Sequence, residues 1–112
     1  NTIFAYWHDL RPVSGSIPVR YQTSGVSPSR AFEVQWLAPY LVGAPPLDVR
    51  VVLYETTGDI DVCYADTIGN NTSYDNGSYA GSGIQGSTAN YIQYSHQTAS
   101  LTEGLVLRYV HP

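Results

Sequence analysis

The residues that could support catalysis are three histidines, nine acidic residues and many serines, which on paper allow a Ser–His–Asp triad. No serine lies in the nucleophile-elbow pattern that exposes an attacking hydroxyl. His8, His96 and His111 lie on separate segments, and only His8 has an acidic neighbour, Asp9. Neighbouring residues on a strand point to opposite faces, and no histidine pair has metal-ligand spacing. We therefore predict that the chain is not an enzyme and that it uses no cofactor.

Two other patterns resemble ligand-binding motifs. Residues 81–86, Gly-Ser-Gly-Ile-Gln-Gly, have the spacing of a dinucleotide-binding loop, but that chemistry needs a helix directly afterwards. Residues 87–90 show no helical pattern, so we interpret these glycines as positions that allow a tight strand edge. Asp59, Asp61 and Asp66 could offer oxygen ligands to calcium. We interpret Asp59 as a turn residue and Asp61 as an exposed strand residue, and predict no metal site.

Three N-glycosylation triplets lie close together in one polar segment, and they begin at Asn70, Asn71 and Asn76. Glycans on Asn70 and Asn71 would collide, so these two are not expected to be modified together. Cys63 is the only cysteine, so no disulfide can form within the chain. It is either a small, half-buried residue or a thiol that links to a cysteine outside the chain.

The ten tyrosines are the other unusual feature. Tyr40, Tyr74 and Tyr79 lie in segments without a core pattern, so we expect them to be exposed. Exposed tyrosines among Ser, Gly and Asn form adaptable contact surfaces. They could stack on sugars or contact another protein, and the sequence does not choose between these two.

Composition sets further limits on function. The 112 residues fit one domain, only 12% of them are charged, and there is no lysine. The net charge of −4 without a basic cluster argues against nucleic acid, which needs several cations along its phosphates. No run approaches the roughly 20 apolar residues of a membrane-spanning helix. A surface of neutral polar side chains is typical of secreted or cell-surface proteins.

Short strands separated by turns must position all of these residues. Alternating apolar and polar residues predict half-buried strands, and no segment has a helical period. The expected strands are Thr2–Trp7, Ile17–Gln22, Ala31–Leu37, Leu47–Tyr54, Ile60–Tyr64, Gly83–Gln85, Asn90–Ser95 and Leu105–Val110. Asp66–Ser82 is expected to be a long polar loop that contributes nothing to the core. Strands without helices predict an antiparallel β-sandwich with a jelly-roll-like arrangement.

The apolar positions of these strands predict the core. It should hold Phe32, Val34, Trp36, Val49, Val51, Leu53, Ile60, Val62, Tyr64, Leu105 and Leu107.

Three groups of short segments, in this order, carry a resemblance to a known family. They are Ile3–Leu10 with Val19–Gly25, Arg30–Trp36 with Val51–Glu55 and Gly58–Ile60, and Gly83–Gln85 with Ile92–Ser95 and Ser100–Leu105. Together they resemble a β-sandwich module that is repeated in large secreted bacterial proteins and is related to nidogen-like and plexin-domain-containing extracellular modules. The resemblance covers nearly the whole chain and implies a non-enzymatic module that accompanies proteases, adhesion repeats and anchoring segments.

Two departures from that family matter. His8 stands where an acidic residue is expected before Asp9. Strands that precede the Trp7 phrase in the family, with an aromatic-Gly entry and a Val-Ser-Asn-Gly strand, have no counterpart here. We therefore expect residues 1–112 to be the later portion of a larger sandwich, starting at Asn1 through processing or as a fragment. Another segment or subunit would complete it.

These observations predict a non-catalytic extracellular module with a structural or adhesive role, and one that is not an isolated monomer. The expected partners are other copies of the chain, in a surface assembly or filament, or a cleaved segment of the same precursor, joined by strand addition. Alternative functions are a carbohydrate-binding module that uses the loop tyrosines with Trp7 or Trp36, and an accessory domain of a secreted hydrolase.

Overall fold

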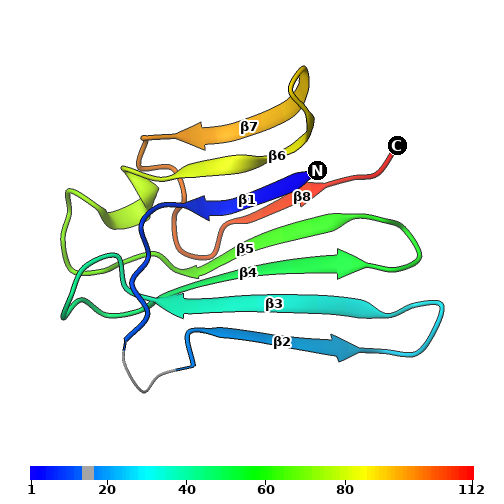
Figure 1. The fold of residues 1–112 in the computed structure, drawn as a ribbon, viewed down its shortest axis with the longest axis horizontal. Helices are drawn as coiled ribbons and strands as arrows, with labels where there is room; N and C mark the ends of the chain where they lie inside the picture. Colours follow the sequence, from blue (N-terminus) through cyan, green and yellow to red (C-terminus); the bar gives the residue numbers. More distant parts are fainter. Residues whose placement is uncertain (14–16) are drawn as a thin grey trace.

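The computed structural model describes residues 1–13 and 17–112, which form two antiparallel β-sheets packed as a sandwich (Figure 1). The larger sheet has five strands in the order β2–β3–β4–β5–β8, and the smaller sheet has three in the order β1–β6–β7. The strands are β1 Thr2–Trp7, β2 Val19–Ser24, β3 Ala31–Ala38, β4 Leu47–Tyr54, β5 Ile60–Asp66, β6 Gly81–Ser87, β7 Asn90–His96 and β8 Val106–Tyr109. One 3₁₀ turn, η1 (Asp75–Gly77), interrupts the strands of the described residues. The prediction of an all-β sandwich is confirmed.

The hydrophobic pattern sets the register of the larger sheet. Val34, Val51 and Val62 lie side by side on neighbouring strands, and Leu107 continues the row on β8. Because strand side chains alternate between faces, this register places the apolar residues of each strand on the face toward β1 and β6. The buried core cluster on that face comprises Val49, Val51, Val62, Tyr64, Ala80 and Leu101.

Tyr64 connects the two sheets through its hydroxyl group. The hydroxyl donates a hydrogen bond to the carbonyl oxygen of Ala5 on β1, at 2.7 Å, and accepts one from the hydroxyl of Ser82 on β6. Burial raises the pKa of Tyr64, so the hydroxyl stays protonated and remains a donor. A single core side chain therefore fixes both β1 and β6 over β5.

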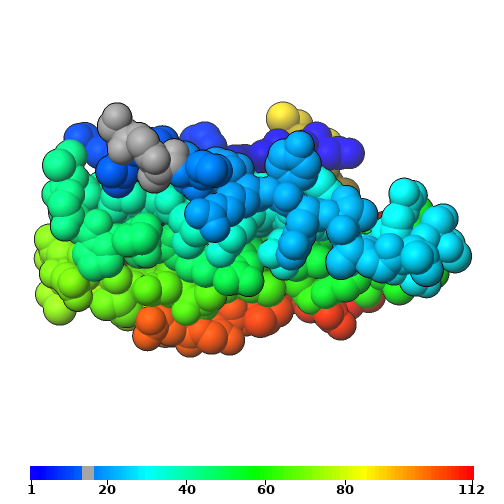
Figure 2. All heavy atoms as spheres, turned by 90° about the horizontal axis from the view of Figure 1, so that it is seen from below, coloured from blue at the N-terminus to red at the C-terminus, as the bar shows by residue number. Residues whose placement is uncertain are grey.

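The predicted core is wrong at two positions, Phe32 and Leu53, whose exposed fractions are 38% and 37%. Both side chains lie on the inner face of the larger sheet, paired with each other across β3 and β4. The smaller sheet is displaced toward one side, with β1 packed against β4. Within the described residues, no layer therefore lies above the inner face of β2 and of part of β3. In Figure 2 β2 lies on the near surface of the molecule, with β1 along the upper margin.

The expectation that Asp66–Ser82 contributes nothing to the core is also wrong. Thr67 and Ala80 are fully buried, and Gly77 is buried against Leu101. Backbone hydrogen bonds hold this segment together, including one from the amide of Leu101 to the carbonyl oxygen of Asn76, at 3.0 Å. Small residues and turn hydrogen bonds therefore make a packed end to the sandwich from a sequence without hydrophobic periodicity.

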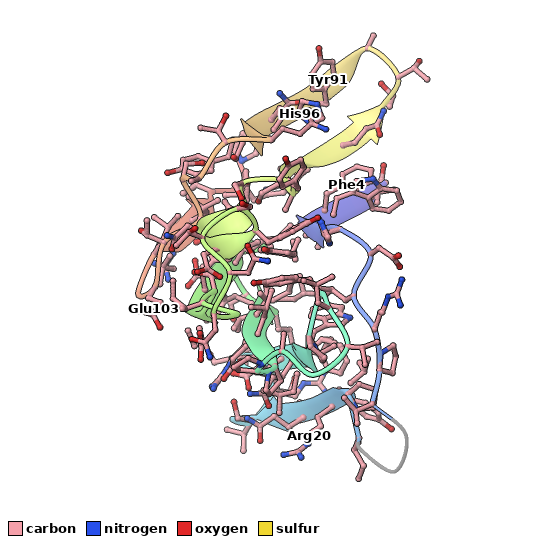
Figure 3. All side chains as sticks on the ribbon, turned by 90° about the vertical axis from the view of Figure 1, so that its left-hand side faces the viewer. Phe4, Arg20, Tyr91, His96 and Glu103 are labelled. Atoms are coloured by element: carbon pink, nitrogen blue, oxygen red, sulfur yellow. The ribbon has the colours of Figure 1, made fainter. Side chains whose placement is uncertain are left out.

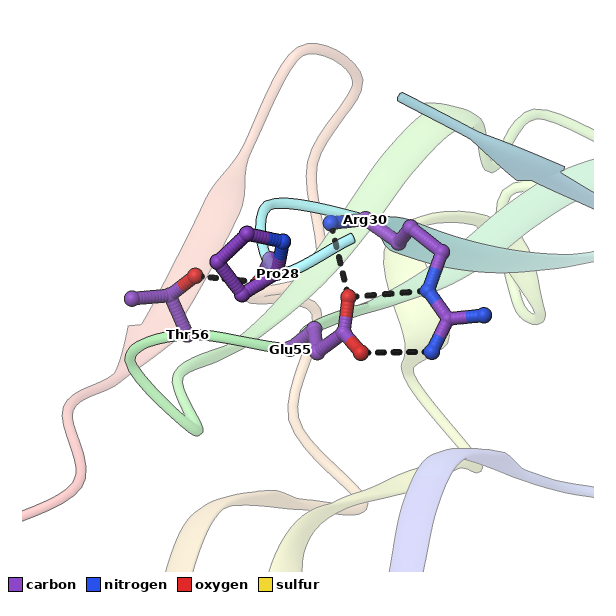
Figure 4. Close-up of polar contacts among 4 residues, drawn as sticks. All are labelled: Pro28, Arg30, Glu55 and Thr56. Atoms are coloured by element: carbon purple, nitrogen blue, oxygen red, sulfur yellow. Dashed lines mark hydrogen bonds and ion pairs between the residues drawn. The ribbon is translucent and has the colours of Figure 1, made fainter. Parts of the chain in front are cut away.

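At the opposite end, an ion pair joins two turns (Figure 4). The guanidinium of Arg30 and its backbone amide both donate to Glu55, at 2.8 Å from Nε and 3.1 Å from the amide. These hydrogen bonds hold the pKa of Glu55 at about 2. Thr56 donates to the carbonyl oxygen of Pro28 beside this pair. The turn after β2 is thus attached to the turn after β4.

Candidate functional site

The side of β1 that faces away from β6 is an open sheet edge. β1 pairs with β6 along one side, and within residues 1–13 and 17–112 no strand pairs with its other side. Backbone N–H and C=O groups along such an edge can pair with another strand, and proteins usually cover or shorten exposed edges for this reason.

A cleft of about 400 Å³ runs along this open edge. Residues 3–10, which comprise most of β1 and the segment after it, form one wall, while Trp36 of β3 and Val49 of β4 form the floor. Trp36 and Val49 are direct partners in the larger sheet, so they present one continuous apolar surface beneath the edge. The cleft thus combines strand-pairing backbone groups with an apolar floor.

Beyond the cleft, apolar side chains on the inner face of β2 and β3 continue the floor. Val19 is the direct partner of Trp36, and Tyr21 is the partner of Val34. Tyr21 is 77% exposed, and its ring lies 6.0 Å from that of Phe32. We name Val19, Tyr21 and Phe32 the uncovered strip; Trp36 beside them is half-buried and packs against the core. The residues of the strip alternate with outward-facing polar residues, as they would in a buried strand, yet the described chain places no layer over them.

The uncovered strip and the β1 edge together offer the two features on which strand addition depends, an unpaired sheet edge and an apolar surface beside it. In such sites the receiving edge supplies main-chain hydrogen bonds, and neighbouring pockets select alternate side chains of the incoming strand. A strand added to β1 would lie above β3, where its inward side chains would meet Trp36 and Phe32. The sequence suggested an incomplete sandwich but did not locate this site, because the offset between two sheets has no sequence signal.

Tyr40 corrects the expectation of an exposed contact surface, because it is only 2% exposed. Its ring stacks on Tyr74 at 5.2 Å between ring centroids, and its hydroxyl donates to Asp75 at 3.1 Å. Burial, with a smaller contribution from Asp75, raises the pKa of Tyr40 to about 12. The Asp75 carboxylate also accepts from the amide of Gly69, at 2.7 Å, so Tyr40 is a structural residue of the packed end.

Tyr74 and Tyr79 continue the same aromatic stack. Tyr74 is half-buried between Tyr40 and Tyr79, whose ring centroid lies 5.0 Å away, and the ring of His8 approaches Tyr74 edge-on. Only Tyr79 of the three predicted contact residues is exposed. A contact role for Tyr79 stays a prediction, whereas Tyr74 mainly packs.

The three sequons differ in accessibility. Asn70 is exposed, whereas Asn71 and Asn76 are half-buried. The side-chain oxygen of Asn71 accepts from the amide of Ser73, and that of Asn76 accepts from the hydroxyl of Thr67. Glycosylation of the site stays a prediction, and the structure favours Asn70 as its acceptor.

Cys63 lies on the outer face of the larger sheet and is half-buried, with a free thiol. Burial raises the pKa of this thiol, with a smaller contribution from Asp61, which disfavours the reactive thiolate. Linkage of Cys63 to a cysteine outside the chain stays a prediction.

The candidate catalytic and metal-binding residues are not brought together. Asp61 pairs with Arg108, and the Asp59 carboxylate accepts from the backbone amide of His111. No group of three His, Cys, Asp or Glu side chains that could hold a metal ion occurs in the described parts of the chain. His8 packs among tyrosine rings, and its Nδ1 is buried without a hydrogen-bond partner in the same residues.

Comparison with known proteins identifies the family. A family model described as NIDO related matches residues 1–107. Searches of curated proteins and of solved structures found no match. None of the described helical segments has the length and apolar character needed to cross a bilayer. Because the match spans nearly all of the 112 residues, this chain belongs to the NIDO-related family, whose modules are in general extracellular and non-enzymatic.

Proposed function

We propose that the chain is a non-catalytic, structural or adhesive extracellular module that binds an extended segment of its own precursor as an added strand on β1. The observation that carries this proposal is the coincidence of an open β1 edge with the cleft over Trp36 and Val49 and with the uncovered strip.

Geometry favours a single extended segment over a second folded copy joined through β1. If two copies paired their β1 edges antiparallel in one plane, both larger sheets would lie on the same side of the joined sheet. The β2 and β3 strands of one copy would then occupy the space of the larger sheet of the other. An isolated strand meets no such obstacle.

A segment of the same precursor is favoured among possible donors. A tethered segment acts at a high effective concentration, so it occupies the edge before a free molecule does. An edge with a neighbouring apolar strip that stayed open would also promote aggregation.

The proposal can be tested on the native material. Sedimentation gives the mass of the assembly, and denaturing mass spectrometry then gives the masses of its separate polypeptides. We expect a polypeptide that contains residues 1–112 together with one further polypeptide, and slow hydrogen exchange of the β1 amides. A single polypeptide in the denatured sample, with native masses that form a series of multiples of it, would instead indicate donation between copies and would refute the precursor donor. A stable monomer with rapidly exchanging β1 amides would refute strand addition altogether.

Two variants separate the docking surface from general surface effects. Tyr21→Asp places a charge in the uncovered strip and should release the added segment. Val42→Asp changes a residue that is also highly exposed but lies in the turn before β4, so it should leave the assembly intact. Equal behaviour of the two variants would contradict the assigned surface.

A further inference from the structure

We propose that the outer face of the smaller sheet binds a neutral oligosaccharide, in a trough between β1 and β7. This inference concerns a different face of the molecule from the β1 edge and does not depend on strand addition. The trough has a volume of about 320 Å³, which is at the lower end of the range for ligand pockets.

Strand register builds the trough from rows of three residues. In one row Trp7 of β1, Gly81 of β6 and His96 of β7 are neighbours, and in the next row Phe4 and Gln93 flank Gly83. Both rows have glycine in the middle, so the floor is backbone and the flanking strands supply the walls. Figure 3 shows Phe4 on β1 with Tyr91 and His96 on β7 at one end of the molecule, away from Arg20 on β2.

The two walls have different chemistry. The β1 wall is aromatic, with Phe4 and Trp7 in an edge-to-face contact at 5.4 Å between ring centroids. The β7 wall offers hydrogen-bonding groups, the amide of Gln93 and the imidazole of His96. A pyranose ring complements both walls, because its C–H groups stack on aromatic rings while its hydroxyl groups form hydrogen bonds with amides and imidazole.

Charge and width restrict the ligand further. No acidic side chain, lysine or arginine lines the trough, so the lining complements a neutral ligand. The walls stand two strand spacings apart, roughly 9–10 Å between backbones. Allowing for atomic radii, this admits a sugar ring but not an α-helix, whose diameter with side chains is about 10–12 Å.

The fold itself does not account for the side chains at this site. Trp7 is 70% exposed and Tyr91 is 64% exposed, so neither contributes much to the core. Gly83 is required by the fold, because a Cβ there would clash with the carbonyl oxygen of Ile92. At Gly81 a Cβ would meet its nearest neighbours at an ordinary 3.8 Å, so the backbone does not require glycine. The absence of a side chain at Gly81 therefore keeps the trough open.

The trough also continues at one end, which suits a chain of sugars better than a single ring. A second hollow, of about 500 Å³, shares Trp7, Gly81 and His96 with the trough and extends to Tyr79. Asp9 stands at this far end and is the only charged side chain in the lining of either hollow. The exposed Tyr79 would therefore contact the saccharide at this end.

The test uses the full chain with neutral hexasaccharides, namely cellohexaose, xylohexaose and mannohexaose, and with hexagalacturonate as an acidic comparison. Trp7 and Trp36 are the only tryptophans, so in a Trp36→Phe background Trp7 is the sole reporter when tryptophan is excited selectively over the ten tyrosines. We expect a saturable blue shift of Trp7 emission with at least one neutral hexasaccharide and none with hexagalacturonate. Titration calorimetry on the unmodified chain should give the same affinity.

Gly81→Ala, which adds a methyl group to the floor, and Gln93→Ala, which removes an amide from the wall, should each weaken binding at least tenfold without changing the melting temperature. Val26→Ala truncates a highly exposed side chain in the turn between β2 and β3, which belongs to neither proposed site, and should leave sugar affinity unchanged. The inference would be overturned by no binding of any neutral hexasaccharide at millimolar concentration, by preference for hexagalacturonate, or by binding that survives both trough variants. A trough that instead binds extended peptides from a peptide array would also overturn it.

Discussion

Leu101→Ala tests whether the segment before β6 belongs to the core. Leu101 is fully buried, and it packs against Gly77, where even a Cβ would lie only 2.6 Å from its Cδ1 atom. The substitution removes three carbon atoms, worth roughly 2.4 kcal/mol at about 0.8 kcal/mol each. An unrelaxed cavity of about 50 Å³ adds roughly 1.2 kcal/mol. We therefore expect a loss of about 3–4 kcal/mol in the free energy of unfolding.

Urea denaturation followed by far-ultraviolet circular dichroism measures this loss, and the melting temperature should fall by roughly 14 °C, at about 4 °C per kcal/mol for a domain of this size. Val42→Ala is the control, because Val42 is 85% exposed and should change stability by less than about 0.5 kcal/mol. If Leu101→Ala also cost less than about 1 kcal/mol, the packed end would not be part of the cooperative core.

Three further predictions concern separate features. Gly77→Ala should cost about 1–3 kcal/mol, because the residue has a φ of +72° and its new Cβ would meet Leu101, and the double variant with Leu101→Ala should lose less than the sum of both in urea denaturation. The contribution of Glu55 to stability should be constant above its ordinary pKa of 4.5 and decline as the pH falls toward about 2, because the hydrogen bonds with Arg30 depress that pKa in the folded state. Glu55→Gln should reduce the decline in a pH series of thermal melts, to which Asp48 and Asp61 also contribute, and an unchanged slope would contradict the assignment. Expression in a host that N-glycosylates should place the glycan on Asn70 in preference to the other two sequons, and glycopeptide mass spectrometry that finds Asn70 unmodified beside an occupied sequon would refute this.

Regular alternation made most of the strands predictable. The predicted bounds of β1 and β4 agree with the observed ones, and in β4 the residues Leu47, Val49 and Val51 alternate cleanly with the polar Asp48 and Arg50. β2 begins at Val19, two residues later than predicted, and β6 begins at Gly81, inside the expected loop. Strand ends that consist of glycine and serine carry no hydrophobic signal, so their bounds depend on pairing with neighbours that the sequence does not reveal.

The candidate site was less predictable than the strands. The prolines and glycines near Tyr40 predict an exposed loop, whereas long-range stacking on Tyr74 buries its ring. Conversely, alternation predicts a core position for Phe32, whose side chain is 38% exposed because the smaller sheet is displaced. Periodicity shows which face of a strand is apolar, but what covers that face depends on how the two sheets are placed.

Strand β1 forms part of both proposed sites. Its open edge borders the cleft, while Phe4 and Trp7 on its outer face form one wall of the trough. A docked strand would restrain the fluctuations of β1. Less conformational entropy of β1 would then be lost when a sugar binds and orders the aromatic wall. Thermodynamic linkage then requires the converse by the same factor, so saccharide binding would tighten the hold of the module on its added strand. In such a molecule, the glycan environment outside the cell would regulate how firmly the assembly is held together.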